Sequence, residues 1–227
     1  MRLLLVGYGR MGKMVERLAP DYGFEIAGRL DDTNNIGGAG IASAPAADVA
    51  VEFSIPSAVA DNLPRLAARR MNVVVGTTGW HEHEARLKQI AADAGIGVVA
   101  ASNFSLGVAL FQSLAERAAT LFAPYPDYGA WIHEIHHSAK KDAPSGTAVT
   151  LQQGMERAGY PHRIDIASSR AGSVPGTHTI GFDGPFETIT LTHASRDRAA
   201  FAQGALQAAK WVQGKRGWFT IRDVLGI

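Results

Sequence analysis

A glycine-rich turn near the start of the chain constrains its fold more than any other feature. The segment RLLLVGYGRMG places Gly7, Gly9 and Gly12 in the spacing G-x-G-x-x-G, after an apolar run and before a helix-period segment. In a βαβ unit the first glycine permits a tight turn, the second lets the backbone approach a pyrophosphate, and the third lets the helix pack on the strand. The pattern therefore predicts a dinucleotide-binding unit. A glycine-rich turn without a ligand is the alternative.

Short apolar runs alternate with helix-period segments through the first hundred residues. Nearly continuous apolar strands are typical of a parallel sheet that is buried on both faces. The expected strands are 2–6, 24–30, 49–53, 72–76 and 96–100, and the expected helices are 10–19, 57–70 and 81–94. This order predicts an α/β fold with a Rossmann-type doubly wound parallel sheet. Pro64 weakens the expectation that the second helix is continuous.

The pattern changes after residue 105, which predicts a second domain. An amphipathic stretch at 106–123 is followed by a strand at 128–137 and a helix at about 145–158. Three β-rich runs, RIDIASS, THTIGF and FETITLTH, then follow with short turns between them. Strands in such close succession belong in an antiparallel or mixed sheet. A last helical segment ends at Gly214.

Composition excludes several classes of protein. The formal net charge is +1, so no field of one sign indicates a nucleic-acid or membrane partner. The absence of cysteine excludes disulfides, thiolate nucleophiles and cysteine-based zinc sites. No apolar stretch approaches the ~20 residues that span a bilayer, and the first residues lack the pattern of a signal peptide. We expect a cytoplasmic protein.

Three further segments extend the predicted cofactor site. Asp31 lies at the expected end of the second strand, where a carboxylate can accept a hydrogen bond from a ribose hydroxyl. GTTGW follows the fourth strand and ASNFS the fifth, and ligands of open α/β sheets bind beyond the carboxyl ends of the strands. Their small and hydroxyl-bearing residues suit a nicotinamide ring. Two ordinary βα turns would have a similar sequence.

The segment EIHHSAKKDAPSGTA, residues 134–148, predicts an anion site. Ser145 is a candidate N-cap, and the next two residues would present N–H groups at a helix start. Lys140 and the histidines would supply countercharge and a proton. A solvated loop before a capped helix is the alternative. No metal is expected, because a strand would point His133 and His137 to one face and His136 to the other.

Together these segments resemble the 4-hydroxy-tetrahydrodipicolinate reductase (dihydrodipicolinate reductase) family of the diaminopimelate route to lysine. The resemblance runs through VGYGRMGKMV, VVGTTGW, ASNFSLGV, EIHHSAKKDAPSGTA, VPGTHTIGF, HASRDRAAFAQGA and RDVLGI. It implies that His136 is the acid/base histidine and Lys140 the proton donor. It implies that the substrate carboxylates are held by His137, Lys140, Ser145, Gly146 and Thr147. It implies a site for NADH and/or NADPH formed by Gly7, Tyr8, Gly9, Arg10, Met11, Gly12, Asp31, Gly76, Thr77, Thr78, Ala101, Ser102, Asn103, Phe104 and Arg198.

The resemblance also implies an architecture and a reaction. Residues 1–105 plus 199–227 would form the dinucleotide-binding domain, and residues 106–198 an inserted α+β domain that binds substrate and builds a homotetramer. The reaction would be reduction of 4-hydroxy-tetrahydrodipicolinate, a small dicarboxylate, by way of dihydrodipicolinate. Another amino- or imino-acid dehydrogenase, such as an aspartate dehydrogenase, and a non-catalytic dinucleotide sensor remain as alternatives.

Three positions depart from the family pattern. Ser138 and Ala139 stand where many members have Arg and His, which leaves less positive charge near the substrate. Asp32 stands where some members have a basic residue that favours a 2′-phosphate. We therefore expect NADH to be used at least as well as NADPH.

Overall fold

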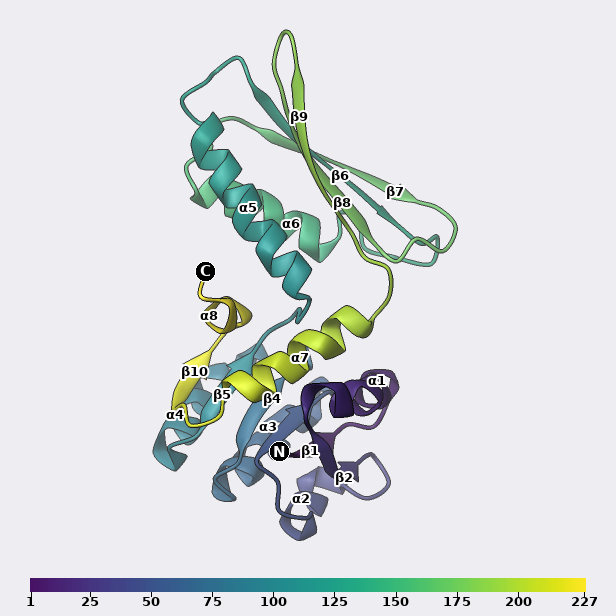
Figure 1. Ribbon diagram of the computed structural model, residues 1–227, viewed down its shortest axis with the longest axis vertical. Helices are drawn as coiled ribbons and strands as arrows, with labels where there is room; N and C mark the ends of the chain where they lie inside the picture. Colours follow the sequence, from purple (N-terminus) through teal and green to yellow (C-terminus); the bar gives the residue numbers. More distant parts are fainter. The chain divides into compact units, whose positions relative to one another are not determined.

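The chain divides into two compact units in the computed structural model, which describes residues 1–227. Unit 1 comprises Met1–Leu106 and Arg198–Ile227, and unit 2 comprises Gly107–Asp197. Unit 2 is therefore an insertion between two segments of unit 1 (Figure 1).

Unit 1 is built on a six-stranded sheet in which all neighbouring strands are parallel. The strand order is β10-β5-β4-β3-β1-β2, so the order reverses between β1 and β3. Ligands of doubly wound folds bind at such a switch point. The observed sheet confirms the predicted Rossmann-type fold. Its strands are β1 (Arg2–Val6), β2 (Glu25–Leu30), β3 (Val49–Glu52), β4 (Asn72–Val75), β5 (Gly97–Ala100) and β10 (Gly217–Phe219).

Helices cover both faces of this sheet, which explains its continuous apolar strands. On one face α3 (Pro56–Ala68) and α4 (Glu84–Ala94) pack on alternate strand residues such as Leu4, Val73 and Val98. On the other, α1 (Arg10–Leu18) packs beside α7 (Ala199–Trp211) (Figure 1). The shorter elements of unit 1 are η1 (Ala19–Tyr22), η2 (Ile36–Gly38), α2 (Gly40–Ser43), η3 (His81–His83) and α8 (Ile221–Leu225).

Helix α3 runs unbroken through Pro64, although proline was expected to weaken it. A proline has no N–H, so the carbonyl four residues before it loses its helical partner. Here that carbonyl belongs to Ala60, and it accepts a hydrogen bond of 3.0 Å from Nη2 of Arg86 in α4. The neighbouring helix thus satisfies the group that the proline leaves open.

Unit 2 contains a four-stranded mixed sheet in the order β7-β6-β8-β9. Strand β6 runs parallel to β7 and antiparallel to β8, and β8 runs antiparallel to β9. Two helices lie together on one face of the sheet (Figure 1). These elements are α5 (Leu106–Phe122), β6 (Gly129–His136), α6 (Gly146–Arg157), β7 (Ile164–Arg170), β8 (Thr177–Asp183) and β9 (Thr188–Ala194).

The strand register builds rows of residues across the helix-covered face of this sheet. One row is apolar and consists of Ile166, Ile132, Ile180 and Leu191. It packs against α5 and α6 through residues such as Phe111 and Leu151. The next row toward the end of β6 is polar and consists of Ser168, Glu134, His178 and His193. The apolar row packs against the helices and stabilises the unit. Buried polar side chains do not contribute in this way, so the polar row is a candidate functional site.

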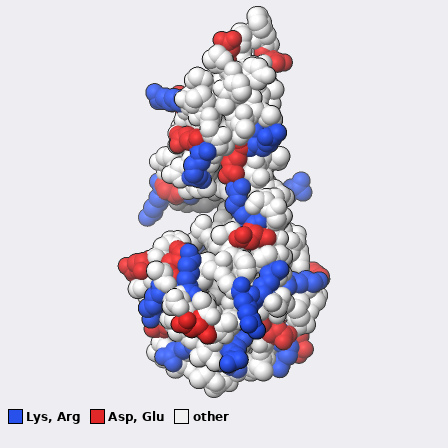
Figure 2. Space-filling model, turned by 90° about the vertical axis from the view of Figure 1, so that its left-hand side faces the viewer, with Lys and Arg blue, Asp and Glu red and all other residues white.

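Surface charge is mixed in both units. Figure 2 shows Lys and Arg interspersed with Asp and Glu over the face it displays. This distribution fits the formal net charge of +1 and gives that face no extended field of one sign. None of the helices is both long enough and apolar enough to traverse a bilayer.

Candidate active site

The glycine-rich turn has the geometry of a dinucleotide cradle. Gly7 has φ +92°, and a Cβ there would lie 2.2 Å from the carbonyl oxygen of Phe53. A Cβ on Gly12 would lie 2.2 Å from the carbonyl oxygen of Gly7, so only glycine lets α1 pack this closely. A Cβ on Gly9 would meet no atom within 4 Å, because this glycine faces open space at the start of α1. Free N–H groups and the helix dipole can therefore meet a pyrophosphate there.

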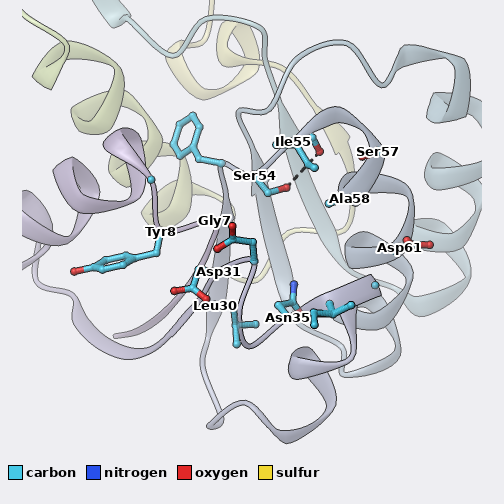
Figure 3. Close-up of a pocket in the computed structure, with 15 residues that line it drawn as sticks. Gly7, Tyr8, Leu30, Asp31, Asn35, Ser54, Ile55, Ser57, Ala58 and Asp61 are labelled. Atoms are coloured by element: carbon cyan, nitrogen blue, oxygen red, sulfur yellow. Dashed lines mark hydrogen bonds between the residues drawn. The ribbon is translucent and has the colours of Figure 1, made fainter.

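A cavity of about 590 Å³ lies at the switch point of the sheet. Figure 3 shows Gly7, Asp31 and Ser54 around it, and each follows the carboxyl end of a strand. Its position and its lining suit the adenosine half of a dinucleotide. The lining residues are Gly7, Tyr8, Gly9, Leu30, Asp31, Asp32, Asn35, Ile36, Gly37, Phe53, Ser54, Ile55, Ser57, Ala58 and Asp61.

Asp31 is held so that one of its oxygens is available. Its Oδ1 accepts hydrogen bonds from the Thr33 hydroxyl at 2.6 Å and from the N–H groups of Thr33 at 2.9 Å and Asn34 at 3.3 Å. The Thr33 hydroxyl, the Thr33 N–H and the Asn34 N–H lower the pKa of Asp31 in spite of a small opposing effect of burial. The ionised carboxylate thus keeps Oδ2 available for a further hydrogen bond.

Arg29, two residues before Asp31, forms an ion pair with Glu16. Its Nε donates to Oε1 of Glu16 at 2.8 Å, and the Tyr8 hydroxyl donates to Oε2 of the same carboxylate. A 2′-phosphate on the ribose would have to compete with Glu16 for this guanidinium.

A second cavity, of about 330 Å³, lies on the other side of the glycine turn. Its lining joins that turn to the loops after β3 and β4 and to the start of α7, through Gly9, Arg10, Met11, Phe53, Ser54, Gly76, Thr77, Thr78 and Arg198. Ala101, Ser102, Asn103 and Phe104 line neither cavity. Phe104 is buried against Phe53, with ring centroids 6.3 Å apart.

Glu52 fixes the loop that carries Thr77. The carboxyl group is fully buried and accepts from the Thr77 hydroxyl at 2.5 Å and from the Ser54 hydroxyl. Thr77 in turn accepts from the Ser54 N–H at 2.8 Å. Burial raises the pKa of Glu52, and these hydroxyls partly offset the rise. Sequence reasoning did not single out Glu52, although a carboxylate ending an apolar strand signals such a role.

In unit 2 the segment 134–148 brings several of the expected residues to one end of the sheet. His136 is buried at the end of β6, and its ring lies edge-on to that of His178, with centroids 5.1 Å apart. His137 is half-buried in the loop that follows. Lys140 is mostly buried and pairs with Asp142 at 2.8 Å, whereas Lys141 is exposed. The ammonium of Lys140 lowers the pKa of Asp142.

Ser145 is the N-cap of α6, as the sequence indicated, and its polar atoms are used inside the protein. Its Oγ accepts from the Ala148 N–H at 3.2 Å and lies 3.0 Å from Nε2 of His178. Its N–H donates to Oε1 of Glu134 at 3.3 Å. Gly146 is exposed, with open space where a side chain would stand, and Thr147 is half-buried. The N–H groups of Gly146 and Thr147, at the start of α6, therefore remain available to a ligand.

Two residues that sequence reasoning missed organise this end of the sheet. Glu134 is fully buried, and its two oxygens accept from the two terminal nitrogens of Arg170 at 2.7 and 3.0 Å. Burial by itself would raise the pKa of Glu134, but hydrogen bonds from Arg170, Ser168 and His136 lower it to about 2. The strict alternation of AWIHEIH, which places Glu134 on the same face as His136, was the available signal.

Glu134, His136 and His178 also bring three potential metal-ligating atoms within 4.8 Å of one another. Both oxygens of Glu134 already accept from the Arg170 guanidinium, so a divalent cation there would lie beside a fixed positive charge. The cluster is better described as a hydrogen-bond network than as a metal centre.

Comparison with known proteins relates both units to one family. Residues 1–104 match the dihydrodipicolinate reductase N-terminus and residues 107–225 match the dihydrodipicolinate reductase C-terminus. A 4-hydroxy-tetrahydrodipicolinate reductase of Stenotrophomonas maltophilia is 40% identical, covering 99% of this chain and 98% of its own. One of Christiangramia forsetii is 36% identical, with the same coverage of 99% and 98%. A dipicolinate-bound dihydrodipicolinate reductase from Paenisporosarcina sp. TG-14 has the same fold, with a TM-score of 0.80, 23% identity and 97% of each chain covered.

Proposed function

The chain belongs to the dihydrodipicolinate reductase family, and we propose that it reduces 4-hydroxy-tetrahydrodipicolinate, by way of dihydrodipicolinate, to tetrahydrodipicolinate, a step of diaminopimelate and lysine biosynthesis. The observation that carries this proposal is the match of both units, in order and over nearly the full chain, to reductases of that name. A likeness confined to unit 1 would have indicated only a dinucleotide-binding fold.

The reductant is NADH or NADPH, which supplies the hydride when bound. Its adenosine half would occupy the cavity beside Asp31, and its pyrophosphate would meet the N–H groups at the start of α1. Its nicotinamide end would lie toward Thr77, whose hydroxyl Glu52 holds in place. These positions are supported by the two cavities that flank the glycine turn.

The substrate is a dicarboxylate, and the start of α6 is suited to bind one of its carboxylates. The N–H groups of Gly146 and Thr147 and the Thr147 hydroxyl would donate to it, aided by the helix dipole. Ser145 would act mainly by capping the helix, since its own N–H and hydroxyl are engaged internally. His137 and Lys140 would provide positive charge for the carboxylates.

Hydride addition at C4 of the conjugated C=C–C=N system leaves an enamine that must take a proton at C3. An ammonium close to the ring can deliver that proton and stabilise the charge that develops at nitrogen. We assign this role to Lys140, whose side chain is 22% exposed, rather than to the exposed Lys141. His136 would act as the second acid/base group.

A kinetic assay tests the function directly. Purified protein should oxidise NADH or NADPH, followed at 340 nm, only when freshly generated 4-hydroxy-tetrahydrodipicolinate is present. Oxaloacetate with ammonia should give no turnover, which separates this activity from that of an aspartate dehydrogenase. Lack of turnover with the dipicolinate precursor would refute the proposal.

Lys140 and Lys141 form a matched pair for testing the assigned proton donor. Lys140→Ala should lower kcat by about 10²–10⁴, the usual range for a lost general acid, while NADH affinity stays near that of the wild type. Lys141→Ala should have a much smaller effect. If Lys141→Ala is the impaired variant, the assignment of the proton donor is wrong.

Assembly and location are part of the same proposal. We infer a homotetramer built through the sheet face of unit 2 that carries no helix. This inference is supported by Trp131 and Ile135, which lie half-buried on that face of β6, and by Phe186 in the β8–β9 hairpin, which is 98% exposed. Light scattering coupled to size exclusion should give four times the 24.1 kDa of the chain. The biosynthetic role of the family favours the cytoplasm.

A further inference from the structure

The carboxylate of Glu134 accepts hydrogen bonds from several parts of unit 2, which is more than charge balance alone would require. From its place on β6 it reaches His136 on its own strand, Arg170 on β7 and Ser145 at the start of α6. The side chain is fully buried, and His178 lies directly opposite it on β8. Three separate parts of unit 2 thus donate hydrogen bonds to this one carboxylate.

The contact between Glu134 and His136 settles which ring nitrogen carries a proton. Oε2 of Glu134 lies against Nδ1 of His136. The two Arg170 nitrogens and the Ser145 N–H also donate to this carboxylate, so it is ionised and offers only lone pairs. The ring nitrogen that meets it must be the donor. The neutral ring therefore carries its hydrogen on Nδ1 and has its lone pair on Nε2.

Nε2 of His136 has no hydrogen-bond partner within the chain and is not among the buried polar atoms that lack one, so this nitrogen keeps some exposure to solvent. Gly176 lies beside it, and a Cβ at that position would be 2.9 Å from Nε2. Only glycine fits beside this edge of the ring, and 11% of the His136 side chain is exposed. A group that gains or gives a proton would reach His136 at Nε2.

We propose that Glu134 is a positioning residue that holds His136 in the Nδ1–H tautomer, so that Nε2 is the atom that exchanges a proton with the substrate. The ring takes one proton at Nε2 and returns it from there, and Nδ1 keeps its hydrogen throughout. The carboxylate stays ionised and balances the positive ring. The inference rests on the proposed function for the identity of the substrate.

The contacts of Arg170 require a carboxylate at position 134, because its guanidinium donates to both side-chain oxygens of Glu134. Its guanidinium donates to both oxygens of Glu134 and also to the carbonyl of Asp142 at 2.6 Å, in the loop that carries Lys140. Glu134 is thereby fixed in the plane that faces Nδ1. The same contacts hold the lysine loop to the strand that carries His136.

Substitution of Glu134 by Gln reverses the hydrogen-bond pattern. The position of Oε1 receives two donors that cannot change role, Nη2 of Arg170 and the Ser145 N–H, whereas the position of Oε2 receives one such donor, Nη1 of Arg170, besides the His136 ring, so the amide oxygen should occupy the Oε1 position. The amide NH₂ then faces Nδ1 of His136 and turns that nitrogen into an acceptor. The hydrogen of the neutral ring moves to Nε2, which can no longer take up a proton.

Two measurements on Glu134→Gln test the inference. Long-range ¹H–¹⁵N spectra at about pH 9, above the usual histidine range, should show His136 with its hydrogen on Nδ1 in the wild type and on Nε2 in the variant. Steady-state kinetics should show kcat lowered by about 10²–10⁴, with the KM for substrate and the affinity for NADH changed less than about threefold.

The control variant is Ser169→Ala. Ser169 lies 3.0 Å from Nε2 of His133, a histidine on the same strand that faces away from Glu134. Ser169→Ala should keep kcat within about twofold and leave the His136 signals in place. Glu134→Asp, which keeps the charge, should retain the Nδ1–H tautomer and more activity than Glu134→Gln.

The spectrum of the wild type decides the inference even if Glu134→Gln does not fold. A neutral His136 with its hydrogen on Nε2 overturns it. Full kcat in a folded Glu134→Gln protein with a reversed tautomer also overturns it, and leaves the reductase activity intact. If the wild type lacks reductase activity but shows Nδ1–H, the proposed function fails and the positioning by Glu134 stands.

Discussion

Acid should weaken unit 2 because it contains a histidine that must be neutral to stay buried. Burial is the main cause that lowers the pKa of His178 from its ordinary value of 6.5 to about 4, and the electrostatic effect of the nearby His136 is the next largest. The unfolded chain therefore binds a proton at this residue between pH 6.5 and 4, and the folded unit does not. The stability contributed by His178 is fully present above pH 6.5 and is lost as the pH falls through 4. The difference between these two pKa values corresponds to about 3 kcal/mol of stability.

The perturbation is His178→Gln, which removes the titrating ring and keeps an amide that can pair with Ser145. Native-state hydrogen exchange, corrected for intrinsic rates, should be followed by mass spectrometry on peptides covering β6 and β8. This reports the free energy of opening of unit 2 alone. Between pH 6.5 and 4 the wild type should lose about 3 kcal/mol more than the variant.

The exposed His162, in the same unit, provides the control. His162→Gln should follow the wild-type curve. Equal losses in wild type and His178→Gln over this pH range would refute the reasoning, since the buried ring would then not be the group that takes up the proton.

Three other outcomes are expected. NADH should match or exceed NADPH in kcat/KM, because Asp32 lines the cavity beside Asp31 and Arg29 is engaged in an ion pair; a tenfold preference for NADPH would contradict this. Thr147→Val should weaken competitive inhibition by pyridine-2,6-dicarboxylate by about 1–3 kcal/mol, and an unchanged inhibition constant would place the carboxylate elsewhere. Gly12→Ala should abolish NADH binding in calorimetry, because the new Cβ would lie 2.2 Å from the carbonyl oxygen of Gly7; retained affinity would show that α1 can shift.

The fold of unit 1 could be predicted because its signals are local. Most of its strands are short apolar runs, and helices such as α4, whose C-cap is Gly95, are closed by a glycine or proline, so periodicity places them. Strand β10 has only three residues, Gly217–Phe219. It is recognised as a strand by its pairing with β5, and no local sequence pattern predicts that pairing. The effect of Pro64 on α3 was mispredicted for the same reason. The donor that satisfies the open carbonyl of α3 belongs to Arg86 on another helix, which local sequence does not reveal.

The candidate site divides in the same way. Glycine spacing and the segment 134–148 are contiguous in sequence, so their chemistry could be inferred directly. The network around Glu134 draws on four separate segments, with Arg170 and His178 brought in by strand pairing. A residue of that kind is identified by its register in the sheet, and register becomes known only when the strands are paired.

The interrupted path of the chain through unit 1 has a consequence for its synthesis. Five strands of the sheet lie before residue 101, but β10 and α7, which packs over β3 and β4, lie after unit 2. At about 5–20 residues per second, a ribosome needs on the order of ten seconds to pass from Ala100 to Gly217. For that interval the nascent sheet has an unpaired β5 edge and an apolar face that α7 does not yet cover. Exposed edges of this kind promote aggregation with other chains. This enzyme should therefore depend on a holding chaperone between the emergence of its first five strands and that of its last.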